Sequence, residues 1–314
     1  MVRDIVHRTL ATPLRWAFHW SGLAMRRASK IRQPRILMYH IIGDEELSVR
    51  QFEWQLKFLR ANFEPTCLGT LLDRLQSGTL SGREVVITFD DGVRNHYEIA
   101  WPVLRAHDVP ATFFVCPGLT ESGEWLWRTE LRVRLKLLDV AERSAAARRA
   151  GCEARDVEAI MEWTKGLPMD ERLAFQHEIE QRTGAFSPSR EQMERHAPLT
   201  WDQLRRMDAR LITIGSHTRT HPMLPTLDER ALHDEIAGSR RILEEKLDRE
   251  VDLFSYPNGA NSAGVVAMAR RHYRAALTTR KGFVASGDDP FLLPRIPAAG
   301  DRASFSRRMY RPSA

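Results

Sequence analysis

The sequence predicts an α/β protein with parallel strands. Short apolar runs rich in β-branched residues, such as Val85–Phe89 and Leu211–Gly215, alternate with helical patterns. Both of these runs lead directly into polar clusters, and in parallel α/β folds the chemistry lies at the carboxyl ends of the strands. The chain has 314 residues, of which 43% are hydrophobic and 28% charged. It is therefore long and apolar enough for one large α/β domain or two small ones.

The first third of the chain alternates between the two patterns. Ser48 and Gln51 form a capping box that predicts the start of a helix. The expected elements are a strand at 36–40, helices at 52–63 and 71–75, a strand at 85–89, a helix near 99–104 and a strand at 111–116. The last three of these elements form one strand–helix–strand unit, with Asp90 and Asp91 directly after its first strand.

The alternation of strands and helices stops between about residue 121 and residue 198, where helical periodicity prevails and strand signals are almost absent. We interpret this segment as a helical insertion. Trp125 and Trp127 open it, and they either stack on a ring of a bound ligand at the mouth of the site or anchor the insertion. The elements expected afterwards are helices at 201–207, 228–247 and 265–271, strands at 211–215, 251–256 and 275–278, and a core-facing segment at 292–297. The basic tail at 301–314 is expected to fray.

Charge and cysteine content narrow the function classes. The net charge is +6, but the first 35 residues alone hold eight Arg or Lys and one acid, so the rest of the chain carries −1. A nearly neutral body argues against nucleic-acid binding, which requires a basic face. The three cysteines, Cys67, Cys116 and Cys152, are odd in number and form no CxxC pair, which favours a reducing compartment and hence the cytoplasm.

The leader, residues 1–34, is basic and amphipathic. Its apolar stretch from Pro13 to Trp20 is interrupted by Arg15 and His19 and is too short to span a bilayer. It also lacks the uncharged core of a signal peptide. A basic segment with tryptophans is suited to an anionic membrane surface, which would place the protein peripherally at the inner membrane surface. The alternative is an exposed helix that packs on the body or is disordered.

The two polar clusters together suggest a metal site. Two adjacent carboxylates, Asp90 and Asp91, are costly after a buried strand unless a cation or a chemical task requires them. His217 and His221 are four residues apart, so both imidazoles can share one face of a turn. Two imidazoles and one carboxylate make a three-ligand site for Zn or a similar divalent ion, which leaves the second carboxylate free as a base. The alternative is a solvated Asp-Gly turn beside structural histidines.

Three motifs resemble those of the polysaccharide deacetylases, carbohydrate esterase family 4, with their NodB-like domain. They are Thr88–Gly92 (TFDDG), Ser216–His221 (SHTRTH) and, in a variant form, Phe254–Gly259 (FSYPNG). The resemblance covers about residues 35–297 and leaves the insertion less familiar. It implies a distorted (β/α) barrel over residues 35–300, and removal of acetyl groups from N-acetylated sugars with a divalent metal ion.

The resemblance also implies roles for individual residues. Asp91, His217 and His221 would hold the metal, and Asp90 would take the proton of the attacking water. A backbone N–H near Tyr256 would complete an oxyanion site. Both Tyr256 and Asn258 would bind substrate.

The sequence departs from the family pattern in two places. Leu253–Ser255 stands where the third motif commonly has an Arg that holds the catalytic Asp. Arg295 could reach back to do this, or it could be a surface or barrel-closing residue. The last family motif commonly supplies a His as general acid, but no His follows His272, which lies in a helical pattern. The general acid is therefore unassigned. His40 is an outside candidate, or the proton that Asp90 takes from water returns through Asp90.

We therefore expect a metal-dependent hydrolase, with zinc as the expected ion. Its substrate would be an N-acetylated amino sugar of a polysaccharide or of a lipid-linked glycan precursor. The alternative is a catalytically impaired, carbohydrate-binding relative, or a hydrolase of another non-peptide C–N bond, and the absent final His favours it. No nucleic-acid partner is expected.

Overall fold

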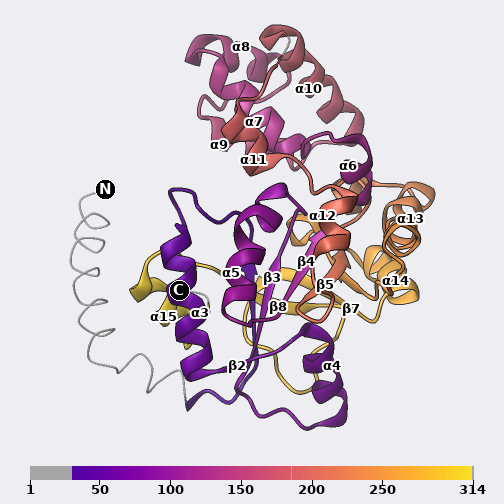
Figure 1. Ribbon diagram of the computed structural model, residues 1–314. Coiled ribbons are helices and arrows are strands. Elements are labelled where there is room, and N and C mark those ends of the chain that lie inside the picture. The colour runs from indigo at the N-terminus through magenta and orange to yellow at the C-terminus, as the bar shows by residue number, and fades with distance from the viewer. Residues whose placement is uncertain (1–29, 185, 313–314) are drawn as a thin grey trace.

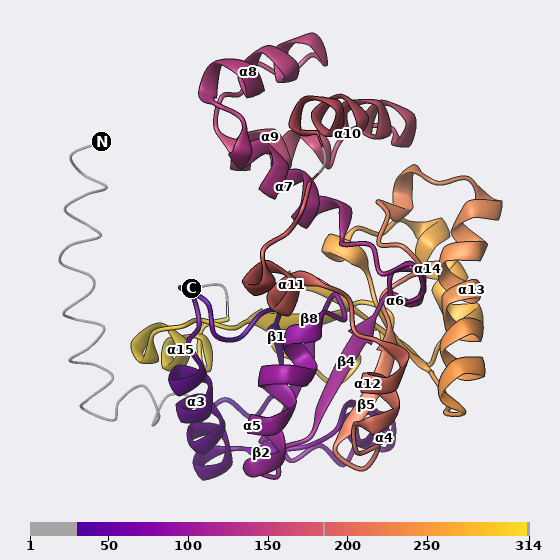
Figure 2. The same ribbon diagram turned by 45° about the horizontal axis from the view of Figure 1, so that its top comes forward.

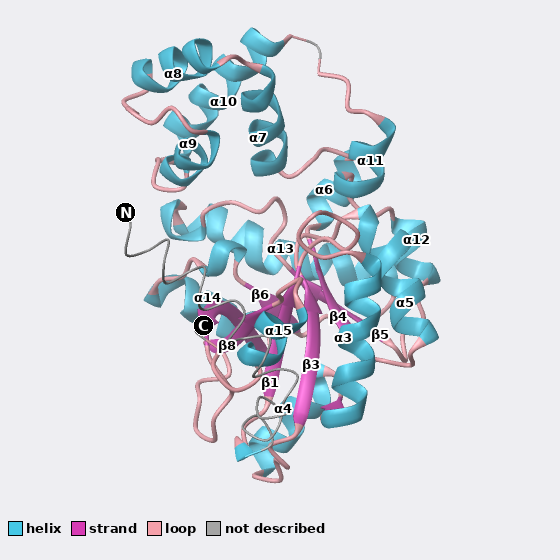
Figure 3. Cartoon of the chain, turned by 90° about the vertical axis from the view of Figure 1, so that its left-hand side faces the viewer, coloured by secondary structure: helices cyan, strands magenta, loops and turns pink. Residues whose placement is uncertain are grey.

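A parallel barrel forms the body of the protein. The computed structural model describes residues 30–184 and 186–312, so most of the predicted leader lies outside the described residues. The strands are β1 (Arg35–Tyr39), β2 (Glu64–Pro65), β3 (Glu84–Phe89), β4 (Ala111–Val115), β5 (Ile212–Ser216), β6 (Leu253–Ser255), β7 (Ala275–Lys281) and β8 (Leu293–Pro297). Seven of them close in the order β1-β8-β7-β6-β5-β4-β3-β1, while β2 pairs with the first two residues of β3. The strands lie at the centre of the body with helices around them (Figures 1 and 3). The predicted α/β fold with a (β/α) barrel is confirmed.

Alternate residues of each strand face opposite sides of the barrel wall. In β3, Val85 and Ile87 belong to the large cluster shared with the surrounding helices, whereas Val86 packs with residues of five other strands inside the barrel. The whole of β3 is buried because both of its faces are covered, as in other parallel sheets. By the same two-residue period, Thr88 and Asp90 follow Val86 on the inner face, so Asp90 reaches the carboxyl end of the barrel interior.

Helices surround this barrel (Figures 1 and 2). They are α3 (Val49–Asn62), α4 (Leu68–Ser77), a π-helical turn (His96–Ala100) leading into α5 (Trp101–Ala106), α6 (Pro117–Ser122), α12 (Trp201–Arg206), α13 (Glu229–Leu247), α14 (Ala263–His272) and α15 (Arg302–Arg308). Short 3-10 turns lie at Leu224–Thr226 and Pro257–Gly259. The predicted capping box is present at α3, where Ser48 and Gln51 bond each other's backbone N–H groups. None of the described helices is long and apolar enough to cross a membrane.

The segment between α6 and α12 consists of helices and lies beyond the carboxyl ends of the strands (Figure 1). Its helices are α7 (Trp127–Leu137), α8 (Val140–Arg149), α9 (Val157–Thr164), α10 (Met169–Thr183) and α11 (Arg190–His196). Residues such as Leu135, Ile160 and Phe175 form a hydrophobic cluster of their own, separate from the clusters of the barrel. Because this insertion stands over the end of the barrel that carries the polar motifs, it is placed to form part of the site.

The expectation that the tail frays is wrong for residues 302–308. They form α15, which Asp301 caps by accepting the N–H of Ser304. Phe305 is fully buried and lies edge-on to Trp54 and Phe58 of α3. The basic composition of this segment concealed a short apolar stripe that tertiary packing covers.

Candidate active site

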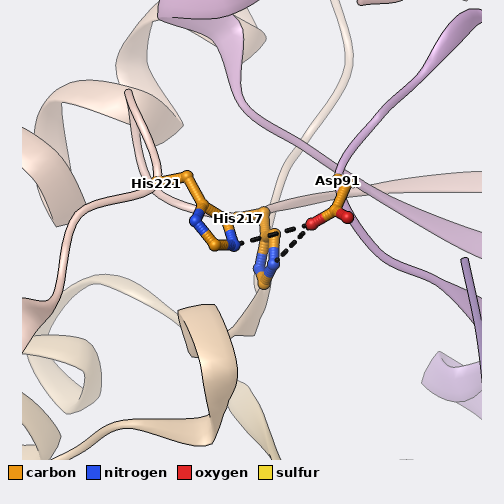
Figure 4. Close-up of side chains that lie close together, drawn as sticks. All are labelled: Asp91, His217 and His221. Carbon is orange, nitrogen blue, oxygen red and sulfur yellow. Dashed lines mark ion pairs between the residues drawn. The ribbon is translucent and has the colours of Figure 1, made fainter. Parts of the chain in front are cut away.

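The two predicted clusters meet at the carboxyl end of the barrel. Asp91 follows β3, while His217 and His221 follow β5, and both strands pair with β4. One carboxylate oxygen of Asp91 lies 3.5 Å from Nε2 of His217 and 3.5 Å from Nε2 of His221 (Figure 4). The three ligand atoms all lie within 4.8 Å of one another. The structure therefore brings together the three residues that the sequence suggested as metal ligands.

Left-handed backbone conformations aim these side chains. Asp91, Thr218 and His221 have φ angles of 80°, 67° and 61°, which cost non-glycine residues of order 1–3 kcal/mol each. Thr218 compensates in part, because its hydroxyl accepts the N–H of His221 at 2.9 Å. Gly92 is also left-handed, and a Cβ there would come within 2.9 Å of the Val115 backbone. Strain of this kind clusters at functional sites.

The donor set fits a divalent ion. His217 donates from Nδ1 to the carbonyl of Ser255 at 2.7 Å, which leaves its Nε2, the atom that faces Asp91, available for an ion. Zinc ligands lie about 2.0–2.2 Å from the ion, so two of them at a tetrahedral angle are about 3.4 Å apart. The observed 3.5 Å separations agree with this geometry.

The protonation states of two of the three residues suit metal binding. For the third, His217, burial lowers the pKa, but Asp90 and Asp91 outweigh it and raise that pKa, so His217 must give up a proton to bind an ion. Burial and the charge of His217 lower the pKa of His221 to about 3, so this imidazole is neutral near pH 7. Burial raises the pKa of Asp91, but the hydrogen bond from His217 and the neighbouring histidine charges outweigh it and hold that pKa well below its usual range. A neutral imidazole and an ionised carboxylate are the forms that ligate metals.

Asp90 lies next to this triad but is held by Arg295. Nη1 and Nη2 of Arg295 donate to the two carboxylate oxygens of Asp90 at 2.7 and 2.6 Å, and the pair is almost entirely buried. Arg295 also donates from Nε to the carbonyl of Thr278 at 2.9 Å. Burial raises the pKa of Asp90, but Arg295 and His217 outweigh it and lower that pKa to about 2. Of the two alternatives for Arg295, the structure shows the one in which it reaches back to Asp90.

Ser255 is a site residue that the sequence reasoning missed. Its hydroxyl donates to Asp90 at 3.3 Å and accepts from Nη2 of Arg295 at 3.1 Å, while its carbonyl accepts from His217. It therefore links the carboxylate of Asp90 to His217, one of the three predicted metal ligands. The available signal was its position, since Ser255 is part of the stretch where the family motif commonly has its Arg.

An oxyanion donor near Tyr256 stays a prediction, but the N–H of Tyr256 itself is not free for this role. Its N–H donates to the carbonyl of Leu277 at 3.1 Å, because Tyr256 continues the pairing of β6 with β7. Its side chain is fully buried, and its hydroxyl donates to the carbonyl of Phe291 at 3.1 Å. Asn258, in contrast, lines the cavity with φ of 55° and accepts a hydrogen bond from Arg128. Substrate contact through Asn258 stays a prediction.

A cavity of about 370 Å³ lies over the triad. The barrel contributes His40, Asp90, Asp91, His217, His221, Asn258 and Thr279, and the insertion with its entry contributes Leu126, Arg128, Thr129, Arg132 and Lys165. No local motif marked the insertion residues, because helical periodicity does not indicate which exposed side chains face a distant strand end. His40 lines the cavity and is exposed.

The tryptophans at the start of the insertion anchor it. Trp127 donates from its indole N–H to the carbonyl of His221 at 3.1 Å, and the guanidinium of Arg172 lies 4.5 Å from its ring centre. Trp125 is 7% exposed and packs against Phe186. The insertion is thus tied to the backbone of His221, a predicted metal ligand, and neither ring lines the cavity over the triad.

Comparisons with known proteins agree with this architecture. A sequence model of the family described as polysaccharide deacetylase matches residues 77–155 and 173–276. YxkH of Bacillus subtilis (strain 168), assigned by name to the polysaccharide deacetylases, is 22% identical over 267 residues, which span 83% of this chain and 70% of YxkH. The structure of the Streptococcus pyogenes deacetylase PplD in complex with acetate has a TM-score of 0.62 at 19% identity, covering 90% of this chain and 98% of PplD. The structure of IcaB from Ammonifex degensii has a TM-score of 0.59 at 20% identity, covering 88% of this chain and 97% of IcaB.

Proposed function

Because the chain belongs to the polysaccharide deacetylase family, we propose that it removes acetyl groups from N-acetylated amino sugars in a metal-dependent reaction. The substrate would be a polysaccharide or a lipid-linked glycan precursor. The observation that supports this most is the pairing of the Asp91, His217 and His221 triad with a separate, buried carboxylate, Asp90. A ligand set beside a free base is what hydrolysis of an acetamide requires.

Asp91, His217 and His221 would hold the ion, with zinc as the expected metal because imidazole and carboxylate ligands suit it. When bound, the metal lowers the pKa of water and polarises the acetyl carbonyl. The remaining requirements fall on the chain itself, which must accept the proton of water and deliver a proton to the departing nitrogen.

Asp90 would accept the proton of the attacking water. Arg295 keeps Asp90 ionised and fixes both of its oxygens, although a pKa of about 2 makes it a weak base. The proton for the departing amine would come from His40, which lines the same cavity, or back from Asp90. His272 is unsuited to this task, because it lies in α14 beside His233 and does not line the cavity.

Removal of the metal is the first test. A chelator is expected to abolish acetate release from N-acetylglucosamine oligomers, and added Zn²⁺ is expected to restore it. Metal analysis and an acetate assay on the same samples measure both effects. Undiminished acetate release after the metal is stripped would contradict metal dependence. Metal-loaded protein that binds these oligomers without releasing acetate would favour the carbohydrate-binding alternative, which the absence of a His after His272 also favours.

We further propose that the protein is cytoplasmic and that its leader contacts the inner membrane surface. The support is the charge of residues 1–35, whose eight Arg or Lys face a single acid. The full chain is expected to co-sediment with anionic vesicles at low salt and to dissociate as salt rises, since surface electrostatics are screened. A variant that starts at Pro34 should not co-sediment. Equal sedimentation of both chains would contradict the proposal.

A further inference from the structure

The insertion gives the catalytic cavity a basic wall. Arg128, Arg132 and Lys165 line the cavity from this side, and no acid of the insertion lines it. Two of these bases have acidic partners, both in α9, to which Lys165 itself is the C-cap. Arg132 pairs with Glu158 at 2.8 Å, and Lys165 pairs with Glu162. Arg128 is the base whose charge no described carboxylate pairs with.

Arg128 is half-buried and incompletely satisfied. Its Nη1 donates to the side-chain oxygen of Asn258, while its Nε is buried and has no hydrogen-bond partner among the described residues. Burial lowers the pKa of Arg128, yet a guanidinium stays charged in proteins. A desolvated cation without a counter-charge is costly, and a guanidinium is shaped for carboxylate or phosphate.

No acid of the barrel forms an ion pair with Arg128 among the described residues, although Asp91 attracts it at longer range. Asp90 is committed to Arg295 through two hydrogen bonds. Asp91 faces His217 and His221 and belongs to the proposed ligand set. The positive charge of Arg128 is therefore directed at whatever occupies the cavity.

We propose that Arg128 binds an anionic group of the glycan, a phosphate or a carboxylate, so that the preferred substrates carry a negative charge close to the acetamide. The volume of about 370 Å³ is near the lower end of the range for small-molecule sites, so the anion belongs to the acetylated sugar or to its direct neighbour. Asn258, which accepts from Arg128, orients the guanidinium from the barrel side. This inference rests on the proposed function, since it assigns a substrate class to the same cavity.

The test is equilibrium binding to the metal-free, chelated protein, which needs no turnover. Calorimetry would compare a neutral probe, the N-acetylglucosamine dimer, with two anionic ones, N-acetylglucosamine 1-phosphate and a disaccharide of N-acetylglucosamine and glucuronate. Arg128→Gln is expected to weaken binding of at least one anionic probe about tenfold or more, because it removes a charge-assisted hydrogen bond. Binding of the neutral dimer should change less than twofold. The probe that loses more identifies phosphate or carboxylate as the recognised group.

Two further variants keep the test decisive. Arg190→Gln removes an exposed Arg that pairs with Glu194 outside the cavity, and it should leave the binding of all three probes unchanged. Arg128→Lys retains the charge but lacks the planar guanidinium, so it should retain part of the anion affinity. This variant still provides a test if Arg128→Gln folds poorly. Equal losses for neutral and anionic probes in the Arg128 variants, or no loss for either, would overturn the inference. If the inference is overturned but neutral oligomers still release acetate, the proposed function stays intact. If anion binding depends on Arg128 but no acetate is released, only the proposed function is rejected.

Discussion

Replacing Asp90 with Asn is expected to reduce acetate release by about 10²–10⁴-fold while the bound metal is retained, because removal of a general base costs about this much. An amide cannot accept the proton of water. The metal should stay because the proposed ligand set is Asp91, His217 and His221. The carboxylate oxygens of Asp90 are instead hydrogen-bonded to Arg295 and Ser255. The measurement is metal content beside turnover for the same preparation, on a glycan that the parent protein deacetylates.

The neighbouring Asp91→Asn provides the contrast. It should lose the metal and the activity together, since a neutral oxygen is a poorer ligand for a divalent cation. Two adjacent residues would thus fail in different ways, which a solvated Asp-Gly turn does not predict. Near-parent turnover of Asp90→Asn would show that the base lies elsewhere. Loss of metal from Asp90→Asn, with its fold intact, would show that this carboxylate is itself a ligand.

The second large effect is expected on stability. Arg295→Met should lower the free energy of unfolding by about 3–5 kcal/mol, because breaking a buried ion pair leaves an uncompensated buried charge. Arg295 is 0% exposed and Asp90 is 3% exposed, so water cannot replace the lost partner. Removal of Arg295 also raises the pKa of Asp90, because burial then acts without its main opposing charge. Denaturant unfolding near pH 7 measures the change.

Two comparisons separate this effect from a general loss of arginine. Arg210→Met removes an exposed Arg that pairs with Asp208 and should cost less than about 1 kcal/mol. The double variant Asp90→Asn with Arg295→Met should be more stable than the sum of the single changes predicts, since the two residues contact each other. A loss below about 1 kcal/mol for Arg295→Met would mean that the buried pair contributes little to the fold.

Local features of the sequence were sufficient to predict the strands and the polar residues at their ends. The apolar run before Asp90 and the run before His217 are each contiguous, and their periodicity and length identify them without knowledge of the rest of the chain. The carboxyl ends of parallel strands meet at one end of the barrel, which accounts for the convergence of Asp91 with His217 and His221.

Contacts between distant segments were not predictable in this way. For Arg295 the sequence left open a partner of Asp90 and a surface or barrel-closing residue, and the place of β8 between β7 and β1 directs it into the barrel interior. An oxyanion donor was expected near Tyr256, but the pairing of β6 with β7 uses the N–H of Tyr256 itself. Both outcomes depend on the order and register of strands, which local periodicity does not contain.

The sequence by itself determined the fold class, the family and the residue types available for metal and proton chemistry, because these depend on near neighbours in the chain. Only the tertiary structure decided which residues complete the site. Ser255 joins Asp90 to His217, Trp127 ties the insertion to His221, and Arg128 faces the cavity across from the barrel. The physical reason is that burial, and with it the strength of charges and hydrogen bonds, is set by segments that meet only when the barrel closes and the insertion packs over it.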